Sequence, residues 1–495
     1  MKTTYLREQE RYTQSALSAL LDAPFNDIIP IIRRLKEFGI VKAVKATDFQ
    51  KDMSDLLDED VEITDVVAND HEHFYVFTFV GVISVAGRIL ICYPKYISRL
   101  KEPTEEMRQI IKVLERYNSK EQIVRMFNDS SEGKSFNLLA VLLFLLQDYH
   151  ENGSYNNTED IIECNGTGEI LWDKTINDSF TIISNRRPFY PELFTRKRVT
   201  DDHDYFKRLH DCIVTRASKE LDDAHLLDIF ELTGVDLSDE DLDGFGDKDY
   251  ILYRIENELA TQFNTRKQLV LKTLFAYIAH NGHIFDIDCF SLFGTNSFNL
   301  VWEDVCQEIL NNKLHTRLID LGIRIDPQYL TEEYHYGNAE LIDVIDKPFW
   351  SITERKAKDT LIPDLITLDE KTFIIFDAKY YTPRLIPGNE PKGQPGIESI
   401  TKQYLYQLAY KDFIHAHHFD SIINCFIIPT EDPQADVFKG HVEMSFLRNS
   451  EFKLENIQVR LLPVKDAYSR YLSGEKYPLS SLKLTQKDPS VRTIR

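Results

Sequence analysis

The chain has 495 residues, of which 43% are hydrophobic and 12% aromatic, and this composition is typical of an ordered globular protein. Its length predicts roughly two to four domains. The net charge of −22 excludes a general attraction of the whole surface to DNA, although a local basic groove could still bind nucleic acid.

The N-terminal sequence lacks the apolar segment of a signal peptide. The longest apolar run, at 138–146, has nine residues, which is too short to cross a bilayer. The cysteines lack the close spacing of a metal site, so we predict buried free thiols in a reducing cytoplasm. We therefore expect a soluble, cytoplasmic protein without membrane contact. The cysteines are Cys92, Cys164, Cys212, Cys289, Cys306 and Cys425.

Residues 12–46 predict two helices followed by a strand. Asn26 or Asp27 can cap the second helix, which would run to Phe38 with Pro30 in or near its first turn. Helix, helix and strand are the order of a winged-helix unit, a relative of the helix-turn-helix that often binds DNA. Helical pairs of this kind also pack against proteins, so DNA binding and partner binding both stay open.

Residues 74–97 are rich in strand-forming residues, and with the helical pair they complete a predicted N-terminal domain over residues 1–100. That domain would bind DNA or a partner. Residues 101–265 predict a mixed α/β region without an assigned role, in which 167–175 is expected to form a strand.

A nucleotide-binding loop at 133–135, Gly-Lys-Ser, is excluded because a P-loop needs a glycine five residues earlier, where this chain has Asn128. The chain therefore has no visible NTPase motor. The acidic segment 236–250 begins like a calcium loop but has Tyr250 in place of the bidentate glutamate. We predict a solvated acidic loop there.

Residues 296–310 predict an amphipathic helix. Its apolar side chains are Phe298, Val301, Trp302, Val305 and Ile309. Glu303 lies beside this apolar stripe and Glu308 lies further along. We select Glu303 as a candidate site residue; an ordinary surface glutamate is the alternative.

Arg355, Lys356 and Lys358 form a basic cluster. It shortly precedes the segment where we expect the functional site, so we predict that these side chains bind the DNA phosphates. A solvated charged face is the alternative.

Two apolar runs, at 365–368 and 373–376, flank a polar break at 369–371. This pattern is typical of a β-hairpin. Because successive side chains of a strand point to opposite faces, Asp377 and Lys379 would share one face about 7 Å apart. Asp364 opens the first strand, so its carboxylate can converge on Asp377. Two carboxylates and an ammonium group suit Mg²⁺, which is usually held by one or two carboxylates, waters and substrate phosphates.

The sequence Pro363-Asp364, twelve residues, then Asp377-Ala378-Lys379 resembles the PD-(D/E)xK nuclease core. In this interpretation Asp364 and Asp377 ligate Mg²⁺, for which Mn²⁺ could substitute, and the Ala378 carbonyl could add a ligand. Lys379 positions the attacking water, and Glu303 serves as a further ligand or base. The alternative is a surface hairpin in which the short motif arose by chance.

Residues 400–413 predict a helix with Gln403 and Gln407 one turn apart. In RecB-like and McrC-like nucleases a helix at this place helps to orient the site, so both glutamines are candidate site residues. An ordinary helix that covers the sheet is the alternative. With a further strand at 422–428, these elements predict an α/β nuclease domain with a mixed central sheet over residues 266–495.

Five stretches, spread over most of the chain, resemble the LlaJI-type restriction endonucleases, which are related to the McrC nuclease subunit. They are 79–97, 168–176, 293–305, 362–368 and 374–381. The resemblance implies a nuclease that acts on foreign double-stranded DNA, with an McrB-like AAA+ GTPase partner that supplies the missing motor. It carries over Asp364, Asp377 and Lys379, together with Glu303 and either Gln403 or Gln407.

We therefore predict a Mg²⁺-dependent restriction endonuclease that breaks phosphodiester bonds of double-stranded DNA. One alternative is a RecB-like repair or recombination nuclease that acts on DNA ends. The other is a non-catalytic subunit for DNA recognition and assembly that retains the fold. The oligomeric state, the recognition sequence and any dependence on methylation are not assigned.

Overall fold

The computed structural model describes residues 3–45, 73–118, 136–156, 158–200, 204–280, 283–286, 289–448 and 454–484. Residues 133–135, discussed above as a rejected nucleotide-binding loop, lie outside these ranges. The chain divides into two compact units. The smaller comprises Met1, Ser84–Arg88 and Met126–Leu292, and the larger comprises Lys2–Ile83, Ile89–Arg125 and Phe293–Arg495. The division by role into 1–100, 101–265 and 266–495 stays a prediction.

The larger unit begins with the predicted pair of helices and strand. They are α1 (Gln14–Leu21), α2 (Phe25–Glu37) and β3 (Val41–Lys45). A three-stranded antiparallel sheet follows in the order β2-β4-β3, with β2 at Arg11–Tyr12 and β4 at His73–Phe77. The order of elements is confirmed, and the winged-helix assignment stays a prediction.

The start of α2 differs from the prediction. Its N-cap is Pro24, without a side-chain cap bond, because proline has no polar side-chain atom that could accept one. The Pro24 carbonyl accepts a bond of 2.9 Å from the Asp27 N–H. The helix thus begins ahead of Asn26 and Asp27. Pro30 is the sixth helical residue and lies inside the helix, where its ring removes one backbone hydrogen bond.

A four-stranded sheet has the order β1-β6-β5-β12. Its strands are β1 (Thr3–Arg7), β6 (Arg88–Tyr93), β5 (Val80–Val85) and β12 (Phe290–Thr295), and α4 spans Thr104–Asn118. These strands confirm the predicted β-rich segment. Gly81 has φ +142°, and a Cβ there would lie 2.0 Å from the Phe293 carbonyl oxygen, so the close approach of the strands requires glycine.

The central sheet has five strands in the order β15-β16-β17-β19-β18. They are β15 (Leu365–Asp369), β16 (Thr372–Ala378), β17 (Ser421–Thr430), β19 (Ile457–Pro463) and β18 (Phe438–Val442). The hairpin β15–β16 is antiparallel, β16, β17 and β19 are parallel, and β18 is antiparallel to β19. The predicted hairpin and the predicted mixed sheet are both confirmed.

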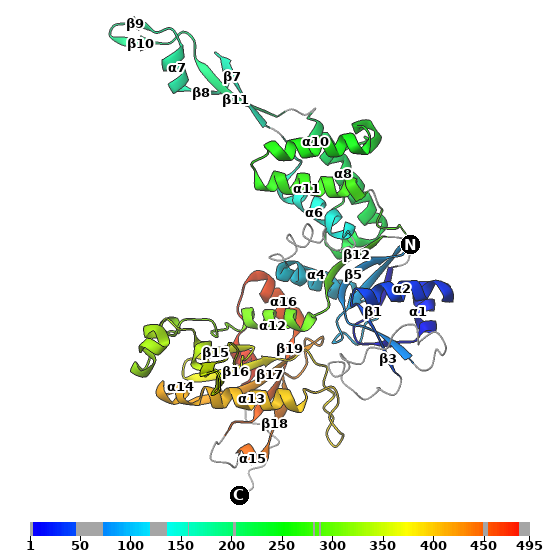
Figure 1. The fold of residues 1–495 in the computed structure, drawn as a ribbon, viewed down its shortest axis with the longest axis vertical. Helices are drawn as coiled ribbons and strands as arrows, with labels where there is room; N and C mark the ends of the chain where they lie inside the picture. The colour runs from blue at the N-terminus through cyan, green and yellow to red at the C-terminus, as the bar shows by residue number, and fades with distance from the viewer. Residues whose placement is uncertain are drawn as a thin grey trace. The chain divides into compact units, whose positions relative to one another are not determined.

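Helices cover both faces of this sheet. Figure 1 shows α12 (Phe298–Ile309) and α16 (Val464–Ser473) on one side and α13 (Ile397–Ala409) on the other. Phe373 and Ile375 of β16 pack on the side of α13, against Tyr406 and Phe413. The predicted helix at 296–310 is confirmed. The predicted helix at 400–413 is two helices, because the chain turns at Tyr410 before α14 (Lys411–Ala416).

The larger unit has several shorter elements. They are η4 (Leu318–Asp320), η5 (Pro327–Tyr329), η6 (Glu332–Gly337), η7 (Leu341–Val344), β13 (Phe349–Trp350), β14 (Arg355–Lys356), α15 (Ser445–Arg448) and η8 (Leu479–Leu482).

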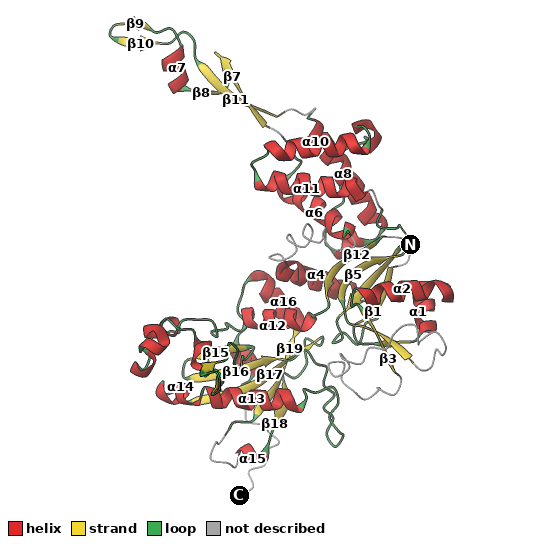
Figure 2. Ribbon diagram, viewed as in Figure 1, coloured by secondary structure: helices red, strands yellow, loops and turns green. Residues whose placement is uncertain are grey.

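The smaller unit combines helices with two small sheets. In Figure 2 its helices are red and its strands are yellow. Its helices are α6 (Leu138–Asn152), α7 (Trp172–Asp178), α8 (Tyr205–Asp223), α9 (Leu226–Ile229), η3 (Leu242–Phe245), α10 (Lys248–Thr261) and α11 (Thr265–His280). One sheet has the order β7-β11-β8, from Thr158–Cys164, Phe194–Thr200 and Glu169–Ile170; the other pairs β9 (Ile182–Ser184) with β10 (Arg187–Phe189).

The predicted strand at 167–175 is wrong for most of its length. Only Glu169–Ile170 is extended, and α7 begins at Trp172. The Thr175 hydroxyl accepts a hydrogen bond from the Phe194 N–H at 3.0 Å, so a tertiary contact favours the helix. Asp173 in the first turn adds a favourable interaction with the helix dipole.

All six cysteines are free, but only four are buried. Cys164 is exposed and Cys289 is half-buried, which corrects the expectation that every thiol is buried. Cys164 ends β7, where a narrow sheet offers little cover. Within the described ranges, no helix is both long enough and apolar enough to span a membrane.

Candidate active site

The hairpin β15–β16 brings the two predicted aspartates together. Leu365 pairs with Phe376, so Asp364 stands opposite Asp377 at the open end of the hairpin. The Ala378 N–H donates to Asp364 Oδ2 at 2.8 Å, and the charge of Asp364 acts to raise the pKa of the Asp377 carboxyl group. The convergence predicted from strand alternation is therefore present.

Lys379 follows β16 directly and faces the same carboxyl groups. Its Nζ lies 2.8 Å from Asp377 Oδ1, and its N–H donates to the Ile427 carbonyl at 2.9 Å, which continues the pairing with β17. Burial acts to lower the pKa of Lys379, but the charge of Asp377 and the hydrogen bond to it raise that pKa overall. Lys379 is therefore an ammonium group at neutral pH.

The surroundings of Asp377 disfavour its ionised form when no cation is bound nearby. Burial raises its pKa well above the usual value, the charge of Asp364 raises it further, and Lys379 offsets only part of this. Close, buried carboxyl groups resist ionisation together. A cation between them would remove that repulsion.

Glu303, on α12, lies within electrostatic reach of the same groups. Burial and then the charge of Asp364 raise the pKa of Glu303 to about 7, while Lys379 and a hydrogen bond with Asn299 act to lower it. Glu308 lies further along α12 and pairs with Lys476 at 3.0 Å between Oε1 and Nζ. The structure thus brings Glu303 to the site and leaves Glu308 at the surface.

The donor set fits a hard cation held by few protein ligands. Among the described residues, no three His, Cys, Asp or Glu side chains form a closed cage for a metal ion. Mg²⁺ is usually bound by one or two carboxylates, with waters and substrate phosphates completing its octahedral shell. Asp364 and Asp377 could supply that pair, and the role of the Ala378 carbonyl stays a prediction.

The two predicted glutamines hydrogen-bond to strands of the central sheet. Gln403 Nε2 donates to the Ile375 carbonyl at 3.0 Å, and Gln407 Oε1 accepts from Asn424 Nδ2 at 2.7 Å. Both glutamines are buried. In the part of the chain that the structure describes, neither hydrogen-bonds to Asp364, Asp377 or Lys379. Their catalytic role stays a prediction, and their contacts fix α13 against the sheet.

Two residues that were not predicted as site residues hold the segment before Asp364. Gln307 Nε2 donates to the Asp364 carbonyl at 2.9 Å, and the Tyr406 hydroxyl donates to the Ile362 carbonyl at 2.9 Å. Burial raises the pKa of Tyr406, and the charges of Asp377 and Asp364 raise it further. The signal for Gln307 was its place one helical turn after Glu303.

The predicted DNA-binding residues lie on a small exposed hairpin, β13–β14. Arg355, Lys356 and Lys358 are all exposed. Lys356 Nζ lies 3.2 Å from Asp346 Oδ1, whereas Arg355 and Lys358 have no ion pair with any residue that the structure describes. None of the three touches the carboxylates of the site, so they do not take part in its hydrogen bonding.

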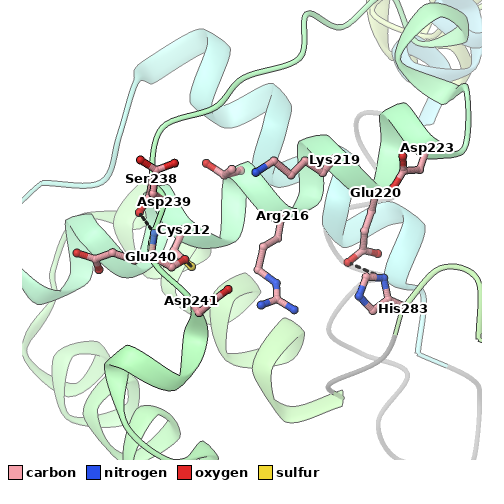
Figure 3. A pocket seen from close by; sticks show the side chains of 11 residues that line it. Cys212, Arg216, Lys219, Glu220, Asp223, Ser238, Asp239, Glu240, Asp241 and His283 are labelled. Carbon is pink, nitrogen blue, oxygen red and sulfur yellow. Dashed lines mark hydrogen bonds and ion pairs between the residues drawn. The ribbon is translucent and has the colours of Figure 1, made fainter.

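A separate pocket occurs in the smaller unit (Figure 3). It is lined by residues of α8, of the acidic segment and by His283, whose Nδ1 lies 3.3 Å from Glu220 Oε1. Its lining includes Arg216 and Lys219 as well as several acidic side chains. None of the predicted site residues lines it, and its mixed charge favours no single ligand.

The sequence matches known restriction proteins. The protein-family model described as LlaJI restriction endonuclease matches residues 79–319 and 331–465. The chain is 26% identical over 436 residues to the "Type II restriction enzyme BsuMI component YdjA" of Bacillus subtilis (strain 168), a match that covers 84% of this chain and 85% of that protein.

Two solved assemblies of Thermococcus gammatolerans are also similar. A chain of the half-complex from a tetradecameric assembly of McrB AAA+ hexamers with bound McrC is 13% identical, with a TM-score of 0.37, over 96% of this chain and 99% of that chain. A chain of the McrBC complex is 14% identical, with a TM-score of 0.26, over 63% of this chain and 88% of that chain.

Proposed function

The chain belongs to the LlaJI restriction endonuclease family, and on that premise we propose that it is the Mg²⁺-dependent nuclease subunit of a restriction system. Its substrate would be foreign double-stranded DNA, and its catalytic domain would be of the PD-(D/E)xK type. The observation that carries this proposal is the cluster of Asp364, Asp377 and Lys379 at one end of a mixed sheet.

Each side chain of the cluster has a distinct proposed task. A divalent cation between Asp364 and Asp377 would activate water and neutralise charge on the scissile phosphate. The Lys379 ammonium orients the attacking water and stabilises negative charge that develops on the phosphate. Glu303, with a pKa of about 7, is suited to accept or return a proton near neutral pH, because general bases work best when their pKa lies near the working pH.

An McrB-like AAA+ GTPase is the proposed partner. The sequence resemblance to McrC supports it, and so does a cluster of exposed apolar side chains in the smaller unit. The cluster consists of Trp172, Ile176, Phe180, Ile182, Ile183 and Phe189. Large exposed apolar side chains that gather in one segment mark a candidate interaction surface. Phe180→Ser with Ile183→Asp should abolish co-purification with the GTPase, whereas Phe263→Ser, at a position of the same unit that is even more exposed, should not.

Cleavage of closed-circular and linear DNA tests the proposed activity. Each substrate is incubated with Mg²⁺, with the chain alone and with an McrB-like AAA+ GTPase plus GTP. Cleavage of the closed circle supports an endonuclease, and its dependence on partner and GTP shows whether the motor is needed. Degradation of linear DNA alone would indicate a RecB-like enzyme acting on ends. Absence of cleavage in every condition would favour a non-catalytic recognition subunit.

A further inference from the structure

A short hairpin precedes the candidate active site in the chain. In β13 and β14, Phe349 stands opposite Lys356 and Trp350 stands opposite Arg355. The Thr353 N–H donates to the Trp350 carbonyl at 3.1 Å, which closes the turn, and the Ala357 N–H donates to the Pro348 carbonyl at 2.7 Å, which closes the base. Residues 349–358 are called the 349–358 hairpin below.

The apolar side chains of this hairpin face solvent. Phe349 is 62% exposed, Trp350 is 65% exposed and Ile352, in the turn, is 99% exposed. An isolated two-stranded hairpin gains little stability from such residues. Large apolar side chains that cluster on a surface instead mark a binding site.

The charge of the 349–358 hairpin identifies the class of ligand. It carries three basic residues and one acidic residue, Glu354, which gives a net charge of +2 in a chain of net charge −22. Cross-strand partners lie on the same face of a hairpin, so Trp350 shares a face with Arg355 and Phe349 shares the other with Lys356. An aromatic ring beside a cation suits a nucleic acid, in which bases and phosphates alternate.

The chain keeps the 349–358 hairpin close to the active site. The Thr360 hydroxyl donates to the Asp346 carbonyl at 2.7 Å, which fixes the segment just beyond the hairpin. Asp364 follows four residues later, so its Cα lies at most about 14 Å from that of Thr360. One turn of duplex DNA is roughly 34 Å long. The base of the hairpin therefore lies within one turn of duplex from a phosphate bound at Asp364.

We propose that the 349–358 hairpin binds duplex DNA beside the scissile phosphate. Ile352, Trp350 and Phe349 pack against bases and sugars at the minor groove, where apolar side chains can wedge between base steps. Arg355 and Lys358 contact phosphates. This inference rests on the proposed nuclease function and assigns part of its DNA-binding surface.

Equilibrium binding of a fluorescein-labelled 30-base-pair duplex to the full chain, in EDTA, tests the proposal without cleavage. Trp350→Ala should weaken binding by about 5-fold to 100-fold, the effect of losing one stacking contact. Arg355→Ala should weaken binding and reduce the slope of log affinity against log salt by about 0.9, whereas Trp350→Ala should leave the slope unchanged. Unchanged melting temperatures show that the variants fold.

Matched controls use side chains of similar exposure elsewhere in the larger unit. Phe446 is 65% exposed, and Lys371 forms an exposed pair with Asp420 at the turn end of β15–β16. Phe446→Ala and Lys371→Ala should keep wild-type affinity for the duplex. If they weaken it as much as Trp350→Ala and Arg355→Ala do, the binding is not specific to the hairpin and the proposal is overturned.

Tryptophan fluorescence reports the contact directly. Trp302 is buried, and Trp172 and Trp350 are exposed, so in a Trp172→Phe chain Trp350 is the one exposed tryptophan. The duplex should quench its emission and protect it from iodide. Lack of quenching, or wild-type affinity in both hairpin variants, overturns the proposal. Loss of GTPase binding with intact DNA affinity would also overturn it and make the hairpin a protein interface.

These measurements separate the hairpin from the chemistry. DNA affinity in EDTA does not require a metal site, so the difference in affinity between the hairpin variants and the control variants reports on the hairpin and not on the chemistry. Loss of cleavage in Asp377→Asn reports only on the proposed nuclease function. A chain that binds DNA through the hairpin but never cleaves it would contradict the proposed nuclease function, whereas the proposed DNA-binding role of the hairpin would stand.

Discussion

The phenol of Tyr380 donates a hydrogen bond to the buried carboxyl group of Glu8, 372 residues earlier in the chain. The same Glu8 oxygen accepts from the Lys95 N–H at 3.1 Å, and Lys95 Nζ lies 4.6 Å from the centroid of the Tyr380 ring. Tyr380 directly follows Lys379. The N-terminal part of the larger unit therefore anchors the residue next to the lysine of the candidate active site.

Two substitutions of Glu8 should distinguish the contribution of this hydrogen bond to stability from the contribution of the carboxylate charge. Glu8→Ala removes the acceptor of a buried hydroxyl, which should lower the free energy of unfolding by about 1 to 3 kcal/mol. Glu8→Gln keeps an acceptor oxygen and should retain most of the stability. Urea unfolding measures both, with Glu102→Ala, an exposed residue of the same unit, as control. Equal losses for Ala and Gln would show that the carboxylate charge, not the bond, is what matters.

Asp377→Asn should stabilise the metal-free protein and abolish cleavage. Burial and Asp364 raise the pKa of Asp377, so its contribution to stability is present at low pH and is lost as the pH rises through the folded-state value. The neutral amide avoids that loss. The thermal unfolding midpoint of Asp377→Asn in EDTA at pH 8 should therefore exceed that of wild type. A lower midpoint would mean that the ion pair with Lys379 outweighs the burial of the carboxylate.

Glu303 should make the stability of the metal-free protein depend on pH. Its pKa is raised to about 7 from the usual 4.5 by burial and by Asp364. The stability it contributes is complete below pH 4.5 and falls as the pH rises through about 7. Between pH 5 and 8, the melting midpoint of wild type should therefore fall relative to that of Glu303→Gln. Glu308→Gln, on the same helix but paired at the surface, should run parallel to wild type.

Gln307→Ala should slow cleavage without weakening DNA binding. Its amide holds the Asp364 carbonyl, and the loss of one hydrogen bond, about 1 kcal/mol, corresponds to roughly a 5-fold fall in kcat. Leu300→Ala, at an exposed position of α12, is the control. A rise in KM with kcat unchanged would instead place Gln307 in DNA binding.

The local parts of the site could be predicted from the sequence. Strand alternation and a polar break fix which side chains of a hairpin share a face, so the sequence alone predicts that Asp364, Asp377 and Lys379 lie together, as the structure shows. The apolar stripe of α12 placed Glu303 at its edge in the same way. In each case the spacing of the residues within one hairpin or helix determines which side chains lie on the same face.

Contacts between distant segments could not be predicted. Helical spacing puts Gln403 and Gln407 on one face of α13 but does not say that this face meets Ile375 and Asn424. Likewise, no periodicity links Glu8 to Tyr380, because their proximity depends on how separate sheets pack. The helix start at Phe25 differs from the prediction because the N-cap, Pro24, has no polar side chain of the kind that marks a helix start in the sequence.

The most direct test of the account measures Mn²⁺ binding and plasmid cleavage in the same preparations of four proteins. Wild type and Asp369→Asn, whose carboxyl lies exposed at the far end of the hairpin, should bind the ion and cleave supercoiled DNA alike, with the GTPase and GTP present. Asp377→Asn should lose ion binding, and both Asp377→Asn and Lys379→Ala should cleave at least about 100-fold more slowly. Cleavage by Asp377→Asn or Lys379→Ala at the wild-type rate would contradict the proposed site.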